Sequence, residues 1–380
     1  MIKRVFWVFL AIFLAFSVAV IGTGVFYTTI STNKPIEKNI RRLEFTNDEF
    51  TILQLTDFHE WAGIEGASSL EVTVQDGLKP ALISFINKAL DDTNPDLVVI
   101  TGDIIFPLSF IYDFLGTVSI DTLTYIADLF EEREQVWTLT FGNHDTESGV
   151  KKEDFLSALE PYQYFLGPPK ENDQQKTFLQ NIEDETKSNL VANYSIPIFN
   201  GKSVMYNIYI LDCGSHYSSA HSYLPITQEQ TDWYTSEFNR LKVKQGKIVP
   251  SIMFTHIPLL EMYEYVNQGR VEVFGINGGI SPSFVPSPLF ETIMQNKDVT
   301  GLFFGHNHES SLSMFVEENG HKLLMAITPN ASAESYDVEE TTMHGRIIKL
   351  KTNGSFKTYV YTSDKNSETN ILEDLIISYD

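Results

Sequence analysis

The stretch Gly305-His306-Asn307-His308 places two imidazoles directly after the run Val299–Phe304. A short apolar run of this kind predicts a buried strand. Imidazole is a favoured ligand of transition metals, and the end of a strand is a rigid place to hold one. The stretch therefore predicts a metal site at the end of a strand, although one such pair alone would be weak evidence.

Four fragments upstream add further side chains able to bind metal, and each follows its own apolar run. They are Asp57-Phe58-His59, Gly102-Asp103, Gly142-Asn143-His144-Asp145 and His256. The runs before them, 50–56, 96–101, 136–141 and 248–255, are predicted strands. Hydrolysis of a phosphate ester needs a strong nucleophile and neutralisation of phosphate charge, and two metal ions about 3.5–4 Å apart supply both. We interpret the five fragments as one two-metal phosphoesterase site.

The elements between these strands predict an α/β fold. Residues 78–93 and 121–135 have apolar side chains at helical spacing, so strands and helices alternate from residue 50 to residue 141. Ligands in such folds gather at the carboxyl ends of strands. Further on, the pattern predicts a strand at 205–211, a helix at 227–244 opened by a Thr227/Gln230 capping box, and a short helix near 288–295. Residues 322–327, 345–350 and 356–361 are expected to be late antiparallel strands, and 168–189 a polar loop.

Composition excludes some classes of function. The chain has 380 residues, of which 43% are hydrophobic, and a formal charge of −23. It contains no basic patch, so we expect no nucleic-acid partner. The lone cysteine, Cys213, excludes a disulfide within the chain.

The first residues predict a membrane segment. Residues 5–27 are strongly apolar and follow Lys3 and Arg4; as a helix they would span about 35 Å, enough for a bilayer. We expect a single-pass anchor in the cell membrane with the rest of the chain outside the cytoplasm. The alternative is a signal peptide cleaved after Ser17-Val18-Ala19, which would give a secreted protein. The predicted organisation is residues 1–30 as anchor or signal segment, 31–42 as linker and 43–380 as one catalytic domain.

The complete array, in this order, resembles the calcineurin-like metallophosphoesterase superfamily from about Leu43 to Leu350. Asp212-Cys213-Gly214 and Phe254-Thr255-His256-Ile257-Pro258 resemble the branch related to purple acid phosphatases. The resemblance implies a β-sandwich flanked by helices in an αββα arrangement.

The resemblance also implies a role for each residue of the array. Asp57, His59 and His308 would hold the first metal, Asp103 would bridge both, and Asn143, His256 and His306 would hold the second. His144 would face the substrate and assist the departing group, and Asp145 would orient His144. The implied reaction is hydrolysis of a phosphate ester by a bridging hydroxide.

The metals, the substrate and the activity stay open at this stage. Histidine, carboxylate and amide ligands suit Mn, Fe or Zn, in divalent or trivalent form. Phe106 stands where true purple enzymes carry an iron-binding tyrosine, so a purple centre is not expected. The alternatives are a phosphodiesterase or a lipid pyrophosphatase at the outer membrane surface, and an inactive envelope binding protein. The sequence does not specify an oligomeric state.

Overall fold

The computed structural model describes residues 42–60, 77–105, 117–147, 149–168, 191–214, 216–217, 222–332, 334–335, 338–339, 342–364, 369–371 and 375–377. All of them belong to one compact unit, Ile40–Asp380. The expected anchor or signal segment, nearly all of the linker, residues 169–189 of the expected polar loop and Phe106 lie outside the described residues. Within the described part, no helix combines the length and the apolar character needed to cross a membrane.

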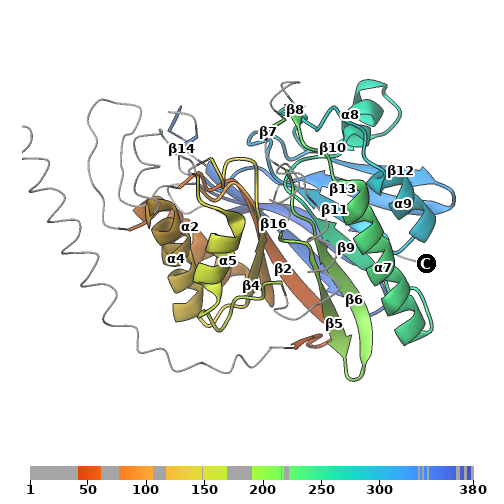
Figure 1. Ribbon diagram of the computed structural model, residues 1–380, viewed down its shortest axis with the longest axis horizontal. Helices are drawn as coiled ribbons and strands as arrows, with labels where there is room; N and C mark the ends of the chain where they lie inside the picture. The colour runs from red at the N-terminus through yellow and green to blue at the C-terminus, as the bar shows by residue number, and fades with distance from the viewer. Residues whose placement is uncertain are drawn as a thin grey trace, which may run out of the picture. The chain divides into compact units, whose positions relative to one another are not determined.

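Two sheets face each other at the centre of this unit (Figure 1). The first has seven strands in the order β18-β17-β16-β2-β3-β4, with β19 paired to β17. Their bounds are β2 Glu49–Leu55, β3 Leu97–Thr101, β4 Trp137–Thr140, β16 Thr342–Lys351, β17 Phe356–Asp364, β18 Thr369–Ile371 and β19 Leu375–Ile377. Because β2, β3 and β4 run parallel, their carboxyl ends meet at one edge.

The second sheet has eight strands in the order β1-β5-β6-β9-β11-β13-β12-β10. Their bounds are β1 Leu43–Glu44, β5 Tyr194–Asn200, β6 Ser203–Ile210, β9 Ser251–Phe254, β10 Val273–Phe274, β11 Val299–Phe304, β12 Ser313–Glu318 and β13 His321–Ile327. Strands β6, β9, β11 and β13 are parallel. Two small hairpins, β7 His216–Tyr217 with β8 Ser222–Tyr223 and β14 Glu334–Ser335 with β15 Val338–Glu339, stand apart from both sheets.

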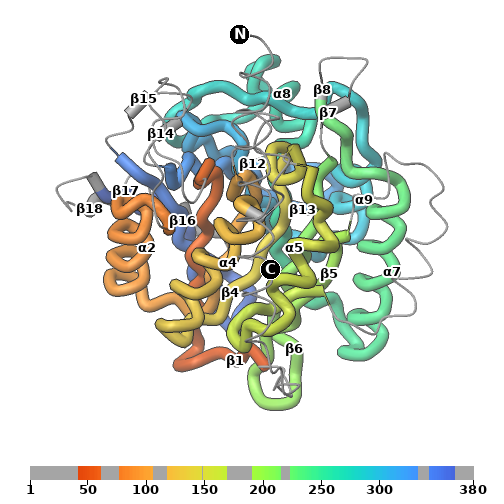
Figure 2. The backbone as a smooth tube through the Cα atoms, turned by 60° about the vertical axis from the view of Figure 1, so that its left-hand side comes forward, coloured from red at the N-terminus to blue at the C-terminus, as the bar shows by residue number. Residues whose placement is uncertain are grey.

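Helices cover the outer faces of the two sheets. Helices α2 Pro80–Thr93, α4 Thr117–Glu132 and α5 Lys152–Leu159 lie beside the seven-stranded sheet, and α7 Gln228–Gln245 and α9 Leu289–Asn296 beside the other (Figure 1). Figure 2 shows α8 Leu260–Asn267 with β7 and β8 at one end of the unit. The expected sheets flanked by helices are therefore confirmed.

Alternation along the strands explains the layers. In β9, Ile252 and Phe254 belong to the core between the sheets, whereas Met253 belongs to the core beneath α7 and α9. Successive side chains of a strand point to opposite faces, so a strand that is apolar throughout must be covered on both. The Thr227/Gln230 capping box is present at the start of α7.

One expectation about the late strands is partly wrong. Strands β16 and β17 are antiparallel, as expected, but β13 runs parallel to β11 and antiparallel only to β12. The strand β12 was not expected. It forms a hairpin with β13 around Asn319-Gly320, where both residues have positive φ, 54° and 67°. An Asn-Gly pair between two strands is the usual signal for such a turn.

Candidate metal centre

The five fragments come together at the carboxyl edge of the two sheets. Asp57 and His59 follow β2, Asp103 follows β3, Asn143 to Asp145 follow β4, His256 follows β9, and His306 and His308 follow β11. Asp57, His59 and His308 form one group of potential ligands, and Asp103, His256 and His306 form another. Within each group the ligand atoms all lie within 4.8 Å of one another. The first group is the set that the resemblance implied for the first metal. The second group contains Asp103, the implied bridging residue, and two of the three residues implied for the second metal, His256 and His306.

Both carboxylates are fixed through one oxygen and face the imidazoles with the other. Oδ2 of Asp57 accepts hydrogen bonds from the Thr56 hydroxyl, at 2.7 Å, and from the backbone N–H of His306, at 2.9 Å. Oδ1 of the same carboxylate lies 3.4 Å from Nε2 of His308. Oδ1 of Asp103 accepts from the backbone N–H of His144 at 2.8 Å, whereas its Oδ2 lies 3.0 Å from Nε2 of His256 and 3.9 Å from Nε2 of His59. One oxygen of Asp103 thus faces members of both groups.

The imidazole of His256 is oriented by the backbone. Its Nδ1 donates to the carbonyl of Thr101 at 2.6 Å, which leaves Nε2 without a proton to face the carboxylates when the ring is neutral. A metal-binding histidine usually donates its other nitrogen to such a partner. His59 and His308 are also close, with their Nε2 atoms 2.9 Å apart.

Several buried polar atoms at this edge have no hydrogen-bond partner. They are Oδ1 of Asp57, both amide atoms of Asn143 and Nε2 of His256, all in residues with no exposed surface. Leaving a buried polar group unsatisfied costs about 1–3 kcal/mol, and native proteins rarely do so without a reason. Oδ1 of Asp57, the amide oxygen of Asn143 and Nε2 of His256 are good metal donors, whereas the amide nitrogen of Asn143 is not. The donor set therefore fits two metal ions.

The loops that hold these residues are strained. Asp57, His59, Asp103 and His306 have φ of 54°, 46°, 48° and 71°. Side chains other than glycine seldom adopt this left-handed region, and such strain gathers at functional sites. The glycines before the ligands permit close packing: a Cβ on Gly142 would lie 2.1 Å from Oδ1 of Asp103, and one on Gly305 would lie 2.0 Å from Oγ1 of Thr56.

The closely packed charges raise the pKa of one candidate ligand histidine and lower that of another. Burial would lower the pKa of His256, but the carboxylates of Asp103 and Asp57 outweigh it and raise the pKa to about 9. Burial and the neighbouring His256 lower the pKa of His306 to about 3. Burial would raise the pKa values of Asp103 and Asp57, but the surrounding histidines hold both below the usual range. The carboxylates are thus ionised at neutral pH, as metal binding requires.

The expected role of Asp145 is wrong. Its carboxylate accepts hydrogen bonds from the backbone N–H groups of Gly142, Asp103, Ile104 and Ile105, at 2.6, 3.0, 2.8 and 3.1 Å. Asp145 therefore ties the loop after β3 to the loop after β4, and it does not orient His144. Burial and the nearby Asp103 raise the pKa of Asp145 to about 6, against the lowering effect of these N–H groups.

Glu147 is a hydrogen-bond partner of His144. Nδ1 of His144 donates to Oε2 of Glu147 at 2.7 Å, one turn further along the chain. Burial would lower the pKa of His144, but Glu147 and Asp103 raise it. Sequence reasoning missed this pair because Asp145 is the nearer carboxylate in the chain. The available signal was the three-residue spacing, which places the two side chains on one face of a turn.

Comparisons with known proteins identify the family of the chain. The sequence pattern described as calcineurin-like phosphoesterase matches residues 50–310. The protein named probable inactive purple acid phosphatase 14, from Arabidopsis thaliana, is 25% identical over 309 residues, which cover 76% of this chain and 74% of that protein. Phosphatase DCR2 of Saccharomyces cerevisiae is 28% identical over 242 residues, 60% of this chain and 38% of that one.

A solved dimetal phosphatase from Danio rerio superposes with a TM-score of 0.53 at 12% identity, covering 87% of this chain and 99% of that one; at this identity the likeness shows the fold alone. Fold and site together define a metallophosphoesterase. The chain belongs to the calcineurin-like phosphoesterase family, and its homologues are similar to purple acid phosphatases.

Proposed function

We propose that this protein is an active phosphoric ester hydrolase with a dinuclear metal site. The observation that carries the proposal is the pair of ligand triplets surrounded by buried donor atoms without partners. Asp57, His59 and His308 would hold one ion, and His256, His306 and Asn143 the other. Asp103 would contact both ions, because its Oδ2 faces members of both triplets. When bound, the metals would lower the pKa of water and neutralise phosphate charge.

His144 would act on the group that departs. Its Nδ1–H is engaged by Glu147, so Nε2 is the ring nitrogen available to give a proton to the leaving oxygen. Glu147 would hold the ring in that orientation. Asp145 would keep the loops after β3 and β4 in register through its four N–H contacts. Mn, Fe and Zn all suit the donor set.

The rival function is a protein of this fold that binds without catalysis. Its support is the word inactive in the printed name of the Arabidopsis thaliana relative. The complete array of histidine, carboxylate and amide donors in this chain favours the active enzyme.

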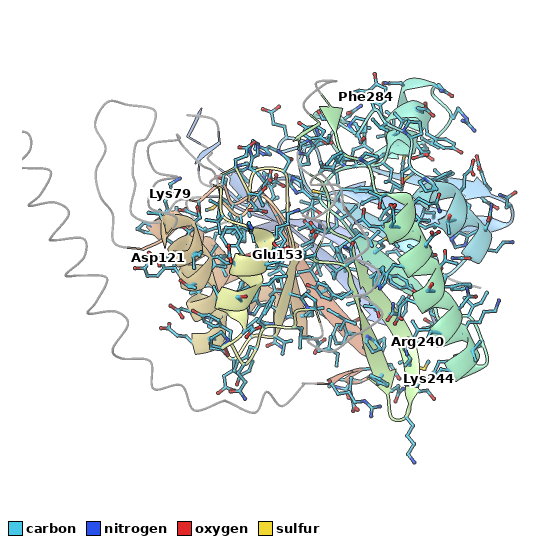
Figure 3. All side chains as sticks on the ribbon, viewed as in Figure 1. Lys79, Asp121, Glu153, Arg240, Lys244 and Phe284 are labelled. Atoms are coloured by element: carbon cyan, nitrogen blue, oxygen red, sulfur yellow. The ribbon has the colours of Figure 1, made fainter. Side chains whose placement is uncertain are left out.

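The test is metal content followed by turnover. The full chain, purified without chelator, is expected to carry two metal ions and to hydrolyse p-nitrophenyl phosphate with added Mn²⁺. Asp103→Asn and His306→Ala should lower the rate of hydrolysis by more than about 100-fold. Loss of a residue that only hydrogen-bonds to a metal ligand already lowers metal affinity or activity by about 10–100-fold. Asp121→Asn, an exposed carboxylate on α4, is the matched control and should change nothing (Figure 3).

Each other outcome has a definite meaning. Turnover of bis-p-nitrophenyl phosphate in place of the monoester would move the assignment to a phosphodiesterase. Two bound metals with no turnover of either ester would favour the binding protein. Chains without metal after supplementation would contradict the proposal.

A further inference from the structure

Exposed apolar side chains gather in one segment beside the metal centre. Among the described residues, six large hydrophobic side chains are exposed, and four of them lie between positions 273 and 285. They are Val273 at 36%, Ile276 at 60%, Phe284 at 55% and Val285 at 36% exposed. We name residues 273–285 the apolar rim. Figure 3 places Phe284 beside α8, at the opposite end of the unit from Arg240 and Lys244.

The apolar rim is also free of charge. No ionisable side chain occurs from Val273 to Phe290, in a chain whose formal charge is −23. Scattered exposed apolar residues are normal, but a cluster without charge marks a binding surface. The rim's own side chains therefore carry no charge that would repel a phosphate ester, although Glu309 lies against Gly278 of the rim.

Hydrogen bonds attach the rim to the ligand loop. The backbone N–H of Ser281 donates to Oδ1 of Asn307, which lies between His306 and His308, at 3.3 Å. Ser311 receives a hydrogen bond from the N–H of Ile276 at 2.9 Å and returns one from its own N–H at 3.0 Å. A Cβ on Gly278 would lie 2.4 Å from the carbonyl of Glu309, so the backbones are in close contact. These contacts fix the backbone of the rim against the loop that carries His306 and His308.

A second link runs through Tyr223. The hydroxyl of Ser283 donates to the backbone carbonyl of Tyr223 at 2.7 Å, and the ring of Tyr223 packs edge to face against His306, with centroids 4.5 Å apart. A small hollow behind the rim, lined by Leu224, Ile257 and Val285 among others, has a volume of about 10 Å³. That is room for about one water molecule.

We infer that the apolar rim binds the alcohol part of the substrate, and that the substrates are phosphate esters of an apolar alcohol. This inference rests on the proposed function, because it takes the phosphate to lie at the metal centre. The occupant is an alkyl group, which needs an uncharged surface beside the phosphate and gains free energy by covering Ile276 and Phe284.

The experiment compares ethyl, butyl and hexyl phosphate with the full chain and added Mn²⁺. The three alcohols differ little as leaving groups, so differences in kcat/KM report binding. Full burial of one methylene group should raise kcat/KM by about fourfold. On an open surface each added methylene should raise kcat/KM by about twofold. We expect hexyl phosphate to exceed ethyl phosphate by about tenfold or more. Ile276→Ser and Phe284→Ser should each reduce that ratio by about threefold.

Val243→Ser is the matched control. Val243 lies on α7, is 83% exposed and is not part of the rim, so its substitution should leave the ratio and the basal activity unchanged. A ratio near one in the unaltered protein would overturn the inference. So would an undiminished ratio in both rim variants, or an equal loss in the control. Loss of vesicle binding or of self-association in the rim variants, with the ratio intact, would assign the rim to a membrane or to a second copy.

Direct binding separates this inference from the proposed function. If neither p-nitrophenyl phosphate nor any of the three alkyl phosphates is hydrolysed, the proposed function fails. Titration with hexylphosphonate and ethylphosphonate then tests binding to the rim by itself. Tighter binding of hexylphosphonate by the unaltered chain, lost in Ile276→Ser, would support the rim. Equal binding of the two phosphonates would contradict it.

Discussion

At the scale of single residues, three of the candidate ligands have one side-chain atom fixed and another facing the centre. Asp57 is held through Oδ2, Asp103 through Oδ1 and His256 through Nδ1. Locking a ligand before the metal arrives removes the entropy of ordering it on binding. The positive φ values at Asp57, His59, Asp103 and His306 are the cost of this arrangement.

Glu147 provides a test at this scale. Loss of a general acid costs about 10²–10⁴-fold, so we expect His144→Ala to lower kcat by that range for an alkyl phosphate. Glu147→Ala should lower kcat by about tenfold, because the ring keeps its proton but loses its orientation. Glu147→Gln, which can still accept from Nδ1–H, should restore part of the loss. Steady-state kinetics on hexyl phosphate measures all three.

A double variant distinguishes orientation from general damage. If Glu147 acts through His144, adding Glu147→Ala to His144→Ala should cause no further loss. Independent, multiplying losses would contradict the role. Glu153→Ala, an exposed carboxylate on α5, serves as the control and should behave as the unaltered protein (Figure 3).

Glycine substitutions test the contact between the loops after β3 and β4. A Cβ on Gly142 would lie 2.1 Å from Oδ1 of Asp103, so Gly142→Ala should displace that carboxylate and lower the bound metal below one ion per chain. Gly246→Ala is the comparison. A Cβ added at Gly246 would meet no atom within 4 Å, but φ is 69° at this helix end. The substitution should therefore cost about 1 kcal/mol of stability and leave the metal in place. Elemental analysis and denaturant unfolding check both variants, and two metals in Gly142→Ala would contradict the prediction.

At the scale of elements, Asp298 connects α7 to the start of β11. Its side chain is 1% exposed and accepts a hydrogen bond from the hydroxyl of Tyr234. Burial raises the pKa of Asp298 to about 6, and the hydrogen bond from Tyr234 offsets only part of this. A folded-state pKa above the unfolded value means that the folded protein binds the extra proton. The stability that this proton provides is therefore lost as pH rises from about 4 to about 6.

Asp298→Asn should remove this pH dependence. Relative to the unaltered chain, the variant should gain up to about 3 kcal/mol of unfolding free energy between pH 4 and pH 7, since one pKa unit corresponds to about 1.4 kcal/mol. Urea unfolding with chelator present at every pH keeps metal out of the comparison. Parallel stability curves for the two proteins would show that Asp298 is not the group responsible.

Elements were predictable where one strong local pattern decided them. The apolar runs before Asp57, Asp103, Asn143, His256 and His306 are all strands, because residues buried on both faces must be apolar throughout. The short helices α5 and α8 were missed, since two turns are too few to show a helical period. The predicted direction of β13 was wrong because the direction depends on its partner β11, which is a separate strand of the chain.

The candidate site was likewise predictable only where a pattern in the sequence decided the positions of its residues. The five fragments were expected to meet because parallel strands bring their carboxyl ends together, and the resemblance implied which residues would share a metal. The partner of His144 did not follow, because the choice between Asp145 and Glu147 depends on which backbone N–H groups the folded loops present. The apolar rim was also not foreseen, since exposure is a property of the folded chain.

At the scale of the whole molecule, we propose that residues 5–27 anchor the protein in the cell membrane, with the catalytic unit outside the cytoplasm. The basis is the uncharged apolar run after Lys3 and Arg4. The full chain should stay with membranes after an alkaline wash, and external protease should digest the catalytic unit in intact cells. A mature protein that begins near residue 20 by mass spectrometry would identify a signal peptide instead.

Each ligand triplet joins the two sheets. Asp57, His59 and Asp103 come from loops after the seven-stranded sheet, and His256, His306 and His308 from loops after the eight-stranded one. A chain with a single cysteine has no disulfide to fasten these layers. Bound metal would therefore cross-link the two sheets. A ligand that binds only the folded state adds to the stability of the folded protein. Shortage of metal in the cell would then lower the stability of the protein as well as its activity.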